Sequence, residues 1–335
     1  MSSTEMDRRA EALILGGTGF VGSHLVPKLL ENNYRVTVVS RASLPRDREQ
    51  LMLFSSYNAQ IVTCELSEYF DSVSFDVIVN LAGKVAGGGY QRKKPLTMFQ
   101  TNIEASTQGV RIAASAKPKL YLFASSAAVY PASHPVPHVE SGALNGWPEY
   151  GPGGYGVAKL VGEFQTRWLY QEHGVKSCSL RFYNLYGPGD VYDRPGGHVV
   201  PVFVQRAVAG KSLQVAGDGT ALRCFVDVRD AVEVIVRMAR MDTDQLHGQA
   251  VNVGHSRPVT IMDLARQVCR AAGASSDLVQ GAKGWPDTSQ RHPDVVRLRS
   301  LLNGWEPDIP PEITLRDQVE DYRKRKTKGL ARCAT

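Results

Sequence analysis

The chain has 335 residues, of which 43% are hydrophobic and 21% charged, fractions typical of a globular protein with a full core. No apolar run approaches the roughly 20 residues of a membrane span, and the first residues lack the apolar core of a signal peptide. Five scattered cysteines without a C-x-x-C pair argue against a disulfide framework or a zinc site. We therefore expect a cytoplasmic protein without a metal and without a membrane partner.

The net charge of +6 comes from one end of the chain. Six lysines and arginines follow Tyr322 with no acid among them, and the other 33 basic residues balance the 33 acidic ones. A neutral body with a basic end favours a solvated tail, 326–335, over a nucleic-acid surface. No nucleic-acid partner is expected.

Short apolar segments alternate with helical patterns in the first half of the chain. Strands are predicted over 12–15, 35–39, 59–64, 77–81, 120–124 and 177–182. Helices are predicted over 21–31, 95–115 and 155–173. This alternation is typical of an α/β protein with a doubly wound parallel sheet.

Beyond residue 182 the pattern breaks into Gly/Pro-rich pieces such as "NLYGPGDVYDRPGG". Residues 183–325 are therefore expected to form mainly a smaller C-terminal lobe that binds the substrate. The segment 226–253 is expected to return to the sheet of the first domain, 1–182.

The first predicted strand runs into "GGTGFVG" and then a helix. Gly17, Gly19 and Gly22 satisfy G-x-G-x-x-G, whose glycines allow a tight turn and the close approach of a pyrophosphate to the helix N-terminus. In this strand–turn–helix context the motif predicts a dinucleotide site in a Rossmann fold. The residues assigned to it are Gly16, Gly19, Phe20, Val21 and Gly22.

The residues after the second strand bear on the choice of cofactor. A site for NAD usually places an acid there, against the ribose 2′-hydroxyl. This chain has Ser40 and Arg41 instead, and a hydroxyl with a guanidinium suits a 2′-phosphate better than a carboxylate does. NADP is therefore predicted, with NAD as the alternative.

A candidate reaction centre lies further along, in "YGVAK". Tyr155 and Lys159 share one face of a helix, so the phenol and the ammonium can meet the same ligand. A nearby ammonium favours the phenolate, which can then exchange protons with a carbinol or a ketone. The serines of "FASSAAVYP" stand at the end of the fifth strand and complete the candidate site.

These motifs, in this order, resemble the extended short-chain dehydrogenases/reductases of the nucleotide-sugar epimerase, dehydratase and reductase group, over about residues 11–325. By this resemblance Ser126 orients the substrate oxygen, Tyr155 is the acid and base, and Lys159 holds the nicotinamide ribose. Further cofactor contacts follow from it, with Glu65 at the adenine ring: Glu65, Leu66, Leu81, Ala82 and Gly83.

Within the group, "NLAGKVAGG" and "NLYGPGDVYDRPGGHVVP" resemble segments of the GDP-fucose synthases, which combine epimerisation with reduction. This likeness implies that His198 donates a proton and that Arg206 meets the diphosphate. The full set of implied substrate contacts is Lys84, Asn184, His198, Arg206, Arg223, Arg291 and Asp294. Turn capping or plain surface exposure remains an alternative for each of them.

Two alanines depart from the group's pattern. Dehydratases carry an Asp-Glu pair where this chain has Ala127 and Ala128, and the 3,5-epimerases carry a cysteine at the second position. A methyl group takes no proton from C3 or C5, and Cys224 does not obviously replace the missing thiol. Hydride transfer at C4 is the chemistry that remains.

The sequence thus predicts an NADP-dependent reductase of a nucleotide-activated 4-keto-6-deoxyhexose. A C4 epimerase with tightly bound NAD(P) has the same three catalytic residues and is the first alternative; a non-catalytic NADP-binding sensor is the second. The resemblance also implies a homodimer built on the helices 95–115 and 155–173. The nucleotide base and the sugar configuration stay open.

Overall fold

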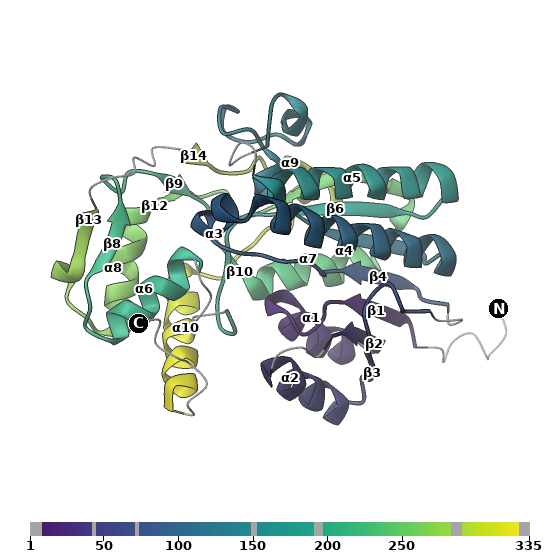
Figure 1. Cartoon of the computed structure of the whole chain (residues 1–335), viewed down its shortest axis with the longest axis horizontal. Coiled ribbons are helices and arrows are strands. Elements are labelled where there is room, and N and C mark those ends of the chain that lie inside the picture. The colour runs from purple at the N-terminus through teal and green to yellow at the C-terminus, as the bar shows by residue number, and fades with distance from the viewer. Residues whose placement is uncertain are drawn as a thin grey trace.

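The computed structural model describes residues 9–41, 45–70, 74–148, 153–190, 197–282 and 290–327. Its main element is a seven-stranded parallel sheet in the order β11-β6-β5-β4-β1-β2-β3, which makes this an α/β Rossmann-like fold (Figure 1). The strands are β1 (Glu11–Leu15), β2 (Arg35–Ser40), β3 (Gln60–Thr63), β4 (Val77–Asn80), β5 (Leu120–Ser126), β6 (Ser177–Phe182) and β11 (His247–Val253).

Helices cover both faces of the sheet because its strands are apolar on both sides. Along β1, Ala12 and Ile14 face the core beneath α1 (Phe20–Glu31) and α7 (Val228–Arg240). Leu13 and Leu15 face the opposite core, which contains residues of α4 (Pro95–Ala116) and α5 (Gly154–His173). Three further helices complete this part: α2 (Pro45–Ser56), α3 (Gly88–Lys93) and α9 (Val296–Leu301).

The predicted doubly wound sheet is confirmed, and the predicted strands and helices of its first half are present with ends shifted by up to two residues. The fifth strand is longer than predicted, because Ser125 and Ser126 continue the ladder opposite Arg181 and Phe182 of β6. The helix α2 was not predicted. Its sequence is mostly polar, and Leu51 and Phe54 are its buried hydrophobic residues.

A smaller lobe packs around a core of its own, formed by α6 (Val199–Val208), α8 (Ile261–Ala272) and α10 (Pro311–Thr327) (Figure 1). Short strands join it: β7 (Leu185–Tyr186), β8 (Leu213–Ala216), β9 (Leu222–Arg223), β10 (Val226–Asp227), β12 (Val259–Thr260), β13 (Val279–Ala282) and β14 (Gln290–Arg291). No helix in the described ranges is long and apolar enough to cross a membrane.

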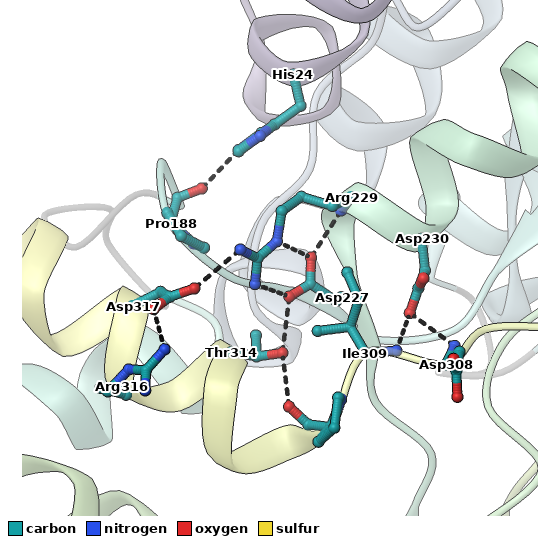
Figure 2. A network of polar contacts seen from close by, with 11 residues as sticks. His24, Pro188, Asp227, Arg229, Asp230, Asp308, Ile309, Thr314, Arg316 and Asp317 are labelled. Atoms are coloured by element: carbon teal, nitrogen blue, oxygen red, sulfur yellow. Dashed lines mark hydrogen bonds and ion pairs between the residues drawn. The ribbon is translucent and has the colours of Figure 1, made fainter.

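A polar network ties α10 to the start of α7 (Figure 2). Buried Asp227 caps α7 and accepts hydrogen bonds from Arg229 and from Thr314 of α10. Arg229 also donates to Asp317, 2.8 Å away on α10. The carboxylate of Asp230 accepts the amides of residues 308 and 309, just before α10. The C-terminal helix is thereby held against the sheet domain.

Of the basic tail predicted for 326–335, the structure describes residues 326 and 327, which are exposed at the end of α10. Residues 323–327 belong to α10, where Lys324 and Arg325 pair with Glu320 and Asp321 one turn earlier. These i,i+4 ion pairs stabilise the last turns of the helix, which the excess of positive charge did not indicate. Residues 328–335 lie outside the described part of the chain.

Candidate active site

A cleft of about 620 Å³ lies between the carboxyl ends of the sheet strands and the smaller lobe. Its walls include the glycine-rich turn after β1, the end of β5, the start of α5, the start of α6 and residues of β9 and β14. Ligands of open α/β sheets bind at this edge, and the volume is that of a small-molecule site.

The glycine-rich turn lines one end of the cleft. Gly16 has a φ of +77°, and a Cβ there would lie 2.8 Å from the Cα of Ala82. A Cβ on Gly22 would lie 2.2 Å from the carbonyl oxygen of Gly17. No side chain caps the first turn of α1, and no acid lies in it, so its free amides are left for an anion. The turn therefore fits the pyrophosphate of a dinucleotide.

The cofactor residues predicted from sequence fall into two groups in the structure. Those in the cleft wall are Gly16, Gly19, Phe20, Val21, Gly22, Leu81, Gly83, Tyr155 and Lys159. Those outside it are Ser40, Arg41, Glu65, Leu66 and Ala82. Arg41 and Glu65 are exposed at the ends of β2 and β3, and the hydroxyl of Ser40 lies 2.9 Å from that of Thr18. The cofactor-binding roles of both groups remain predictions.

The structure brings the three predicted catalytic residues together. The Ser126 hydroxyl is hydrogen-bonded to the Tyr155 phenol and accepts the amide of Ala128 at 3.2 Å. Lys159 donates to the carbonyl oxygen of Ala124 at 2.8 Å, and its Nζ lies 5.8 Å from the centre of the Tyr155 ring. Phenol, hydroxyl and ammonium thus meet at the end of β5.

Burial dominates the protonation of this group. It raises the pKa of Tyr155 to about 12, although the hydrogen bond with Ser126 acts against the rise. Burial also lowers the pKa of Lys159 to about 8, against the charge of Glu163, which raises it. Tyr155 therefore holds its proton at neutral pH and needs nearby positive charge to act as a base.

Methyl groups line the cleft beside these residues. Ala127 and Ala128 begin a short 3-10 turn, η1 (Ala127–Val129), and both contribute to the wall. Burial raises the pKa of the Cys224 thiol to about 12, and this residue is not in the wall. Among the described lining residues the sole carboxylate is Asp190, 3.7 Å from Nδ1 of His198.

Four of the predicted substrate residues line the cleft: Asn184, His198, Arg223 and Arg291. The parallel pairing of β9 and β14 places Arg223 directly opposite Arg291. Burial lowers the pKa of Arg291 to about 10, which still leaves it charged at neutral pH. Two paired arginines at one end of a cleft suit a phosphate-bearing ligand.

Comparison with known proteins agrees with this site. The model of the family described as "NAD dependent epimerase/dehydratase family" matches residues 12–254. The chain belongs to this family. It is thus an enzyme of a family whose members act on nucleotide sugars and depend on NAD, which confirms the prediction of an enzyme, whereas the choice between NADP and NAD stays a prediction.

Two curated relatives show where the chain stands among members of the family. It is 28% identical to UDP-N-acetyl-alpha-D-glucosaminuronate decarboxylase of Bacillus cytotoxicus over 94% of this chain and 98% of that protein. It is 29% identical to UDP-glucuronic acid decarboxylase 3 of Arabidopsis thaliana, over 93% and 89%.

Two solved structures share the fold over nearly the whole chain. The UDP-glucose 4-epimerase of Thermotoga maritima aligns with a TM-score of 0.79 and 26% identity, covering 94% of this chain and 99% of that one. The UDP-N-acetylglucosamine 4-epimerase of Methanobrevibacter ruminantium aligns with a TM-score of 0.83 and 24% identity, over 95% and 99%. The narrower resemblance to GDP-fucose synthases stays a prediction.

Three predicted substrate residues of this family member lie outside the cleft wall. The ammonium of Lys84 donates to the Tyr90 hydroxyl at 3.0 Å. The guanidinium of Arg206 donates to the carbonyl oxygen of Ser212 beyond the end of α6. Asp294 accepts the amide of Val296 at the start of α9. Each of the three thus has a local hydrogen-bond partner, which is compatible with the alternatives of turn capping or plain surface exposure.

Sequence reasoning missed two kinds of residue in this epimerase/dehydratase-family site. Apolar wall residues of α6 and its neighbours, such as Val200, Phe203 and Phe225, carry no motif. The buried pair Glu163 and Arg181 lies directly behind the catalytic group. A glutamate four residues after Lys159 and a lone arginine in the apolar strand "SCSLRF" were the available indications.

Proposed function

We propose that this enzyme inverts C4 of a nucleoside-diphosphate hexose, with a UDP-sugar as the substrate class. One observation carries the proposal: Ser126, Tyr155 and Lys159 meet in a cleft where Ala127 and Ala128 replace the acid and base that chemistry at other carbons needs. The same three groups suffice for oxidation and reduction at a single carbinol.

The reaction balances without a second substrate. Tyr155, as the phenolate, takes the proton of the C4 hydroxyl while Ser126 holds the oxygen. NAD(P), held by the glycine-rich turn and Lys159, would supply the oxidation and the later reduction at C4 by taking a hydride from this carbon and giving it back. The 4-keto sugar then rotates in the cleft, so that reduction occurs on the opposite face of C4. Tyr155 returns the proton to the C4 oxygen, so C4 is inverted and no cofactor is consumed. Protonated Lys159 favours the phenolate throughout.

The other end of the cleft supports the choice of a nucleotide-activated sugar. Arg223 and Arg291 are proposed to hold the diphosphate, because Arg223 is buried, Arg291 is half-buried, and the two arginines lie opposite each other in the cleft wall. A UDP-sugar is proposed because the relatives and the Thermotoga structure are named for UDP-sugars.

Decarboxylation of a UDP-uronic acid is the second candidate, and the names of the curated relatives favour it. It would begin with the same oxidation at C4, after which the carboxylate on C5 leaves as carbon dioxide, C5 takes a proton from water, and the C4 ketone is reduced again by the hydride first removed. The predicted reduction of a 4-keto-6-deoxyhexose uses the same residues as well but consumes one NADPH per turnover. The three reactions differ in stoichiometry.

A homodimer through α4 and α5 is proposed along with this function. Leu96 at the start of α4 is 64% exposed, and Trp168 on α5 is 50% exposed with Phe164 stacked on it at 5.8 Å. Sedimentation at micromolar concentration of the wild type and of Trp168→Glu tests the proposal. A monomeric wild type refutes it.

The function is tested by incubating the purified protein with UDP-glucose, UDP-galactose, UDP-glucuronic acid and a 4-keto-6-deoxy nucleotide sugar, with product analysis by NMR. Inversion at C4 at constant NAD(P)H absorbance is expected. Release of carbon dioxide from the uronic acid establishes the second candidate instead. NADPH oxidation with the keto sugar establishes the reductase, and no turnover of any of the four refutes the proposal.

A further inference from the structure

A buried carboxylate lies one helical turn beyond the catalytic lysine. Glu163 is on α5, four residues after Lys159, and both of its carboxylate oxygens accept hydrogen bonds. The hydroxyl of Ser125 donates to Oε1 at 2.5 Å. Arg181 of β6 donates to Oε1 at 2.9 Å and to Oε2 at 2.7 Å. Glu163 and Arg181 thus form a bidentate ion pair, and the two residues are only 7% and 4% exposed.

The arginine of this pair is anchored by further elements. Its Nη1 donates to the hydroxyl of Tyr130 at 2.8 Å and to the carbonyl oxygen of Glu140 at 2.7 Å. The Tyr130 hydroxyl in turn donates to Oδ1 of Asn252 on β11 at 2.6 Å. Residues from α5, β5, β6, β11 and the segment before α5 thus hold Glu163 in one place.

Stability alone is a weak explanation for this pair. Taking two charges out of water is unfavourable, and apolar side chains of the same volume often stabilise a core as well or better. The position of the pair indicates another role. Its carboxylate contacts Ser125, the neighbour of catalytic Ser126, and lies on the same helix face as Lys159.

We propose that Glu163 is a positioning residue for the C4 reaction: it fixes the end of β5 through Ser125 and, with its charge, holds Lys159 as the ammonium that Tyr155 needs. The inference rests on the proposed function, since it assigns Glu163 a part in the same proton transfer. The two hydrogen bonds from Arg181 keep the carboxylate aimed at the end of β5.

The charges around Lys159 determine the direction of the expected effect. On its own helix the titratable groups one turn before and one turn after Lys159 are Tyr155 and Glu163, and β5 contributes the neutral Ser126. The other such groups near the cleft, from β6, the loop after β4 and the lobe, are Arg181, Lys84, Asp190, His198, Arg223 and Arg291. Glu163 is the one that opposes the loss of the Lys159 proton. Its removal therefore lowers the pKa of Lys159.

The test compares Glu163→Gln with Glu163→Asp, and uses Glu172→Gln, an exposed residue of the same helix, as the matched control. The titration midpoint of Lys159 is read by NMR of protein with isotope-labelled lysine, with its resonance identified by its loss in Lys159→Arg. In Glu163→Gln the midpoint is expected about 1 unit below that of the wild type. In Glu163→Asp, which keeps the charge, it stays within about 0.3 unit, and in the control it does not move.

Turnover gives the second measurement. In Glu163→Gln kcat is expected to fall about 10-fold or more with KM nearly unchanged, and the limb of the pH profile that reflects loss of the Lys159 proton shifts to lower pH. In Glu163→Asp kcat falls because the shorter side chain loosens its contact with Ser125, but the profile stays in place. A folded Glu163→Gln with an unchanged Lys159 midpoint, or with kcat within about twofold of the wild type, overturns the proposal.

The outcomes keep the two proposals apart. A wild type that turns over no sugar refutes the proposed function, whereas the Lys159 midpoint still decides whether the charge of Glu163 acts on this lysine. Should Glu163→Gln not fold, the double variant Glu163→Gln/Arg181→Gln removes both buried charges at once and takes its place. A Lys159 midpoint equal to that of the wild type in this variant overturns the proposal as well.

Discussion

Tyr155→Phe is the most direct test of the candidate site, because the structure separates its effect on folding from its effect on turnover. The variant loses one hydroxyl, which is hydrogen-bonded to Ser126. The Ser126 hydroxyl keeps its bond from the amide of Ala128 at 3.2 Å, so no buried polar group is left without a partner there. The stability lost is therefore about 0.5–1.5 kcal/mol, the net contribution of one hydrogen bond.

The loss of turnover should be far larger. Removing a positioned acid and base lowers a rate by roughly 10²–10⁴, or about 3–5.5 kcal/mol of barrier. Phenylalanine has no proton to exchange with the C4 oxygen, so both the oxidation and the reduction at C4 become slower. Binding of NAD(P) should persist because the glycine-rich turn is unchanged.

The assay follows sugar inversion by NMR and unfolding by calorimetry, with Tyr121→Phe as the matched control. Tyr121 is also a buried tyrosine of the β5 region, and its hydroxyl accepts Nδ2 of Asn80 at 3.0 Å, outside the cleft wall. The control should lose a similar amount of stability and keep its turnover within about threefold. Turnover of Tyr155→Phe within about tenfold of the wild type would refute the acid–base assignment.

Three further predictions concern other parts of the molecule. Arg41→Asp should weaken NADPH binding about 10–100-fold, the loss of one charged hydrogen bond, and NADH binding far less; equal wild-type affinity for both cofactors, measured by fluorescence titration, contradicts this. Because Ala128 offers no base, turnover in deuterium oxide should place no deuterium at C3 or C5, and rapid incorporation seen by NMR would require another base. Burial raises the pKa of Asp230 to about 6, so stability from its protonated form is lost as the pH rises through 6. The free energy of unfolding of Asp230→Asn, relative to that of the wild type, should therefore rise by about 1–3 kcal/mol between pH 4 and pH 8, as measured by denaturant unfolding. A difference between the two proteins that does not change with pH would contradict this.

The sheet could be predicted from the chain because its patterns are local. Apolar runs such as "ALIL" and "VIVN" mark strands wherever they pack, and the glycines of "GGTGFVG" allow a turn that few other residues tolerate. The ends of elements were less well predicted. The strand β5 continues through Ser125 and Ser126 because β6 pairs with them, and this pairing is a property of two segments about 55 residues apart.

The candidate site shows the same division. Tyr155 and Lys159 share a helix face by spacing alone, so their meeting was predictable from four residues of sequence. For Lys84 and Arg206, a resemblance in sequence did not reveal that Tyr90 and the Ser212 carbonyl occupy their charged ends. A long charged side chain binds the polar groups that lie near it in the folded chain, and these groups cannot be identified without the fold.

The sequence by itself determined the glycine-rich turn, the order of the sheet strands in the first half, and the tyrosine–lysine pair. Each of these depends on residues within one element or one turn. The tertiary structure alone decided that Arg223 faces Arg291, because β9 and β14 are joined by hydrogen bonds between segments about 70 residues apart. It alone decided that Glu163 is locked between Ser125 and Arg181, which come from two different strands. Spacing along the chain determines contacts within a helix or a turn, whereas contacts between strands require the register that the packed core imposes.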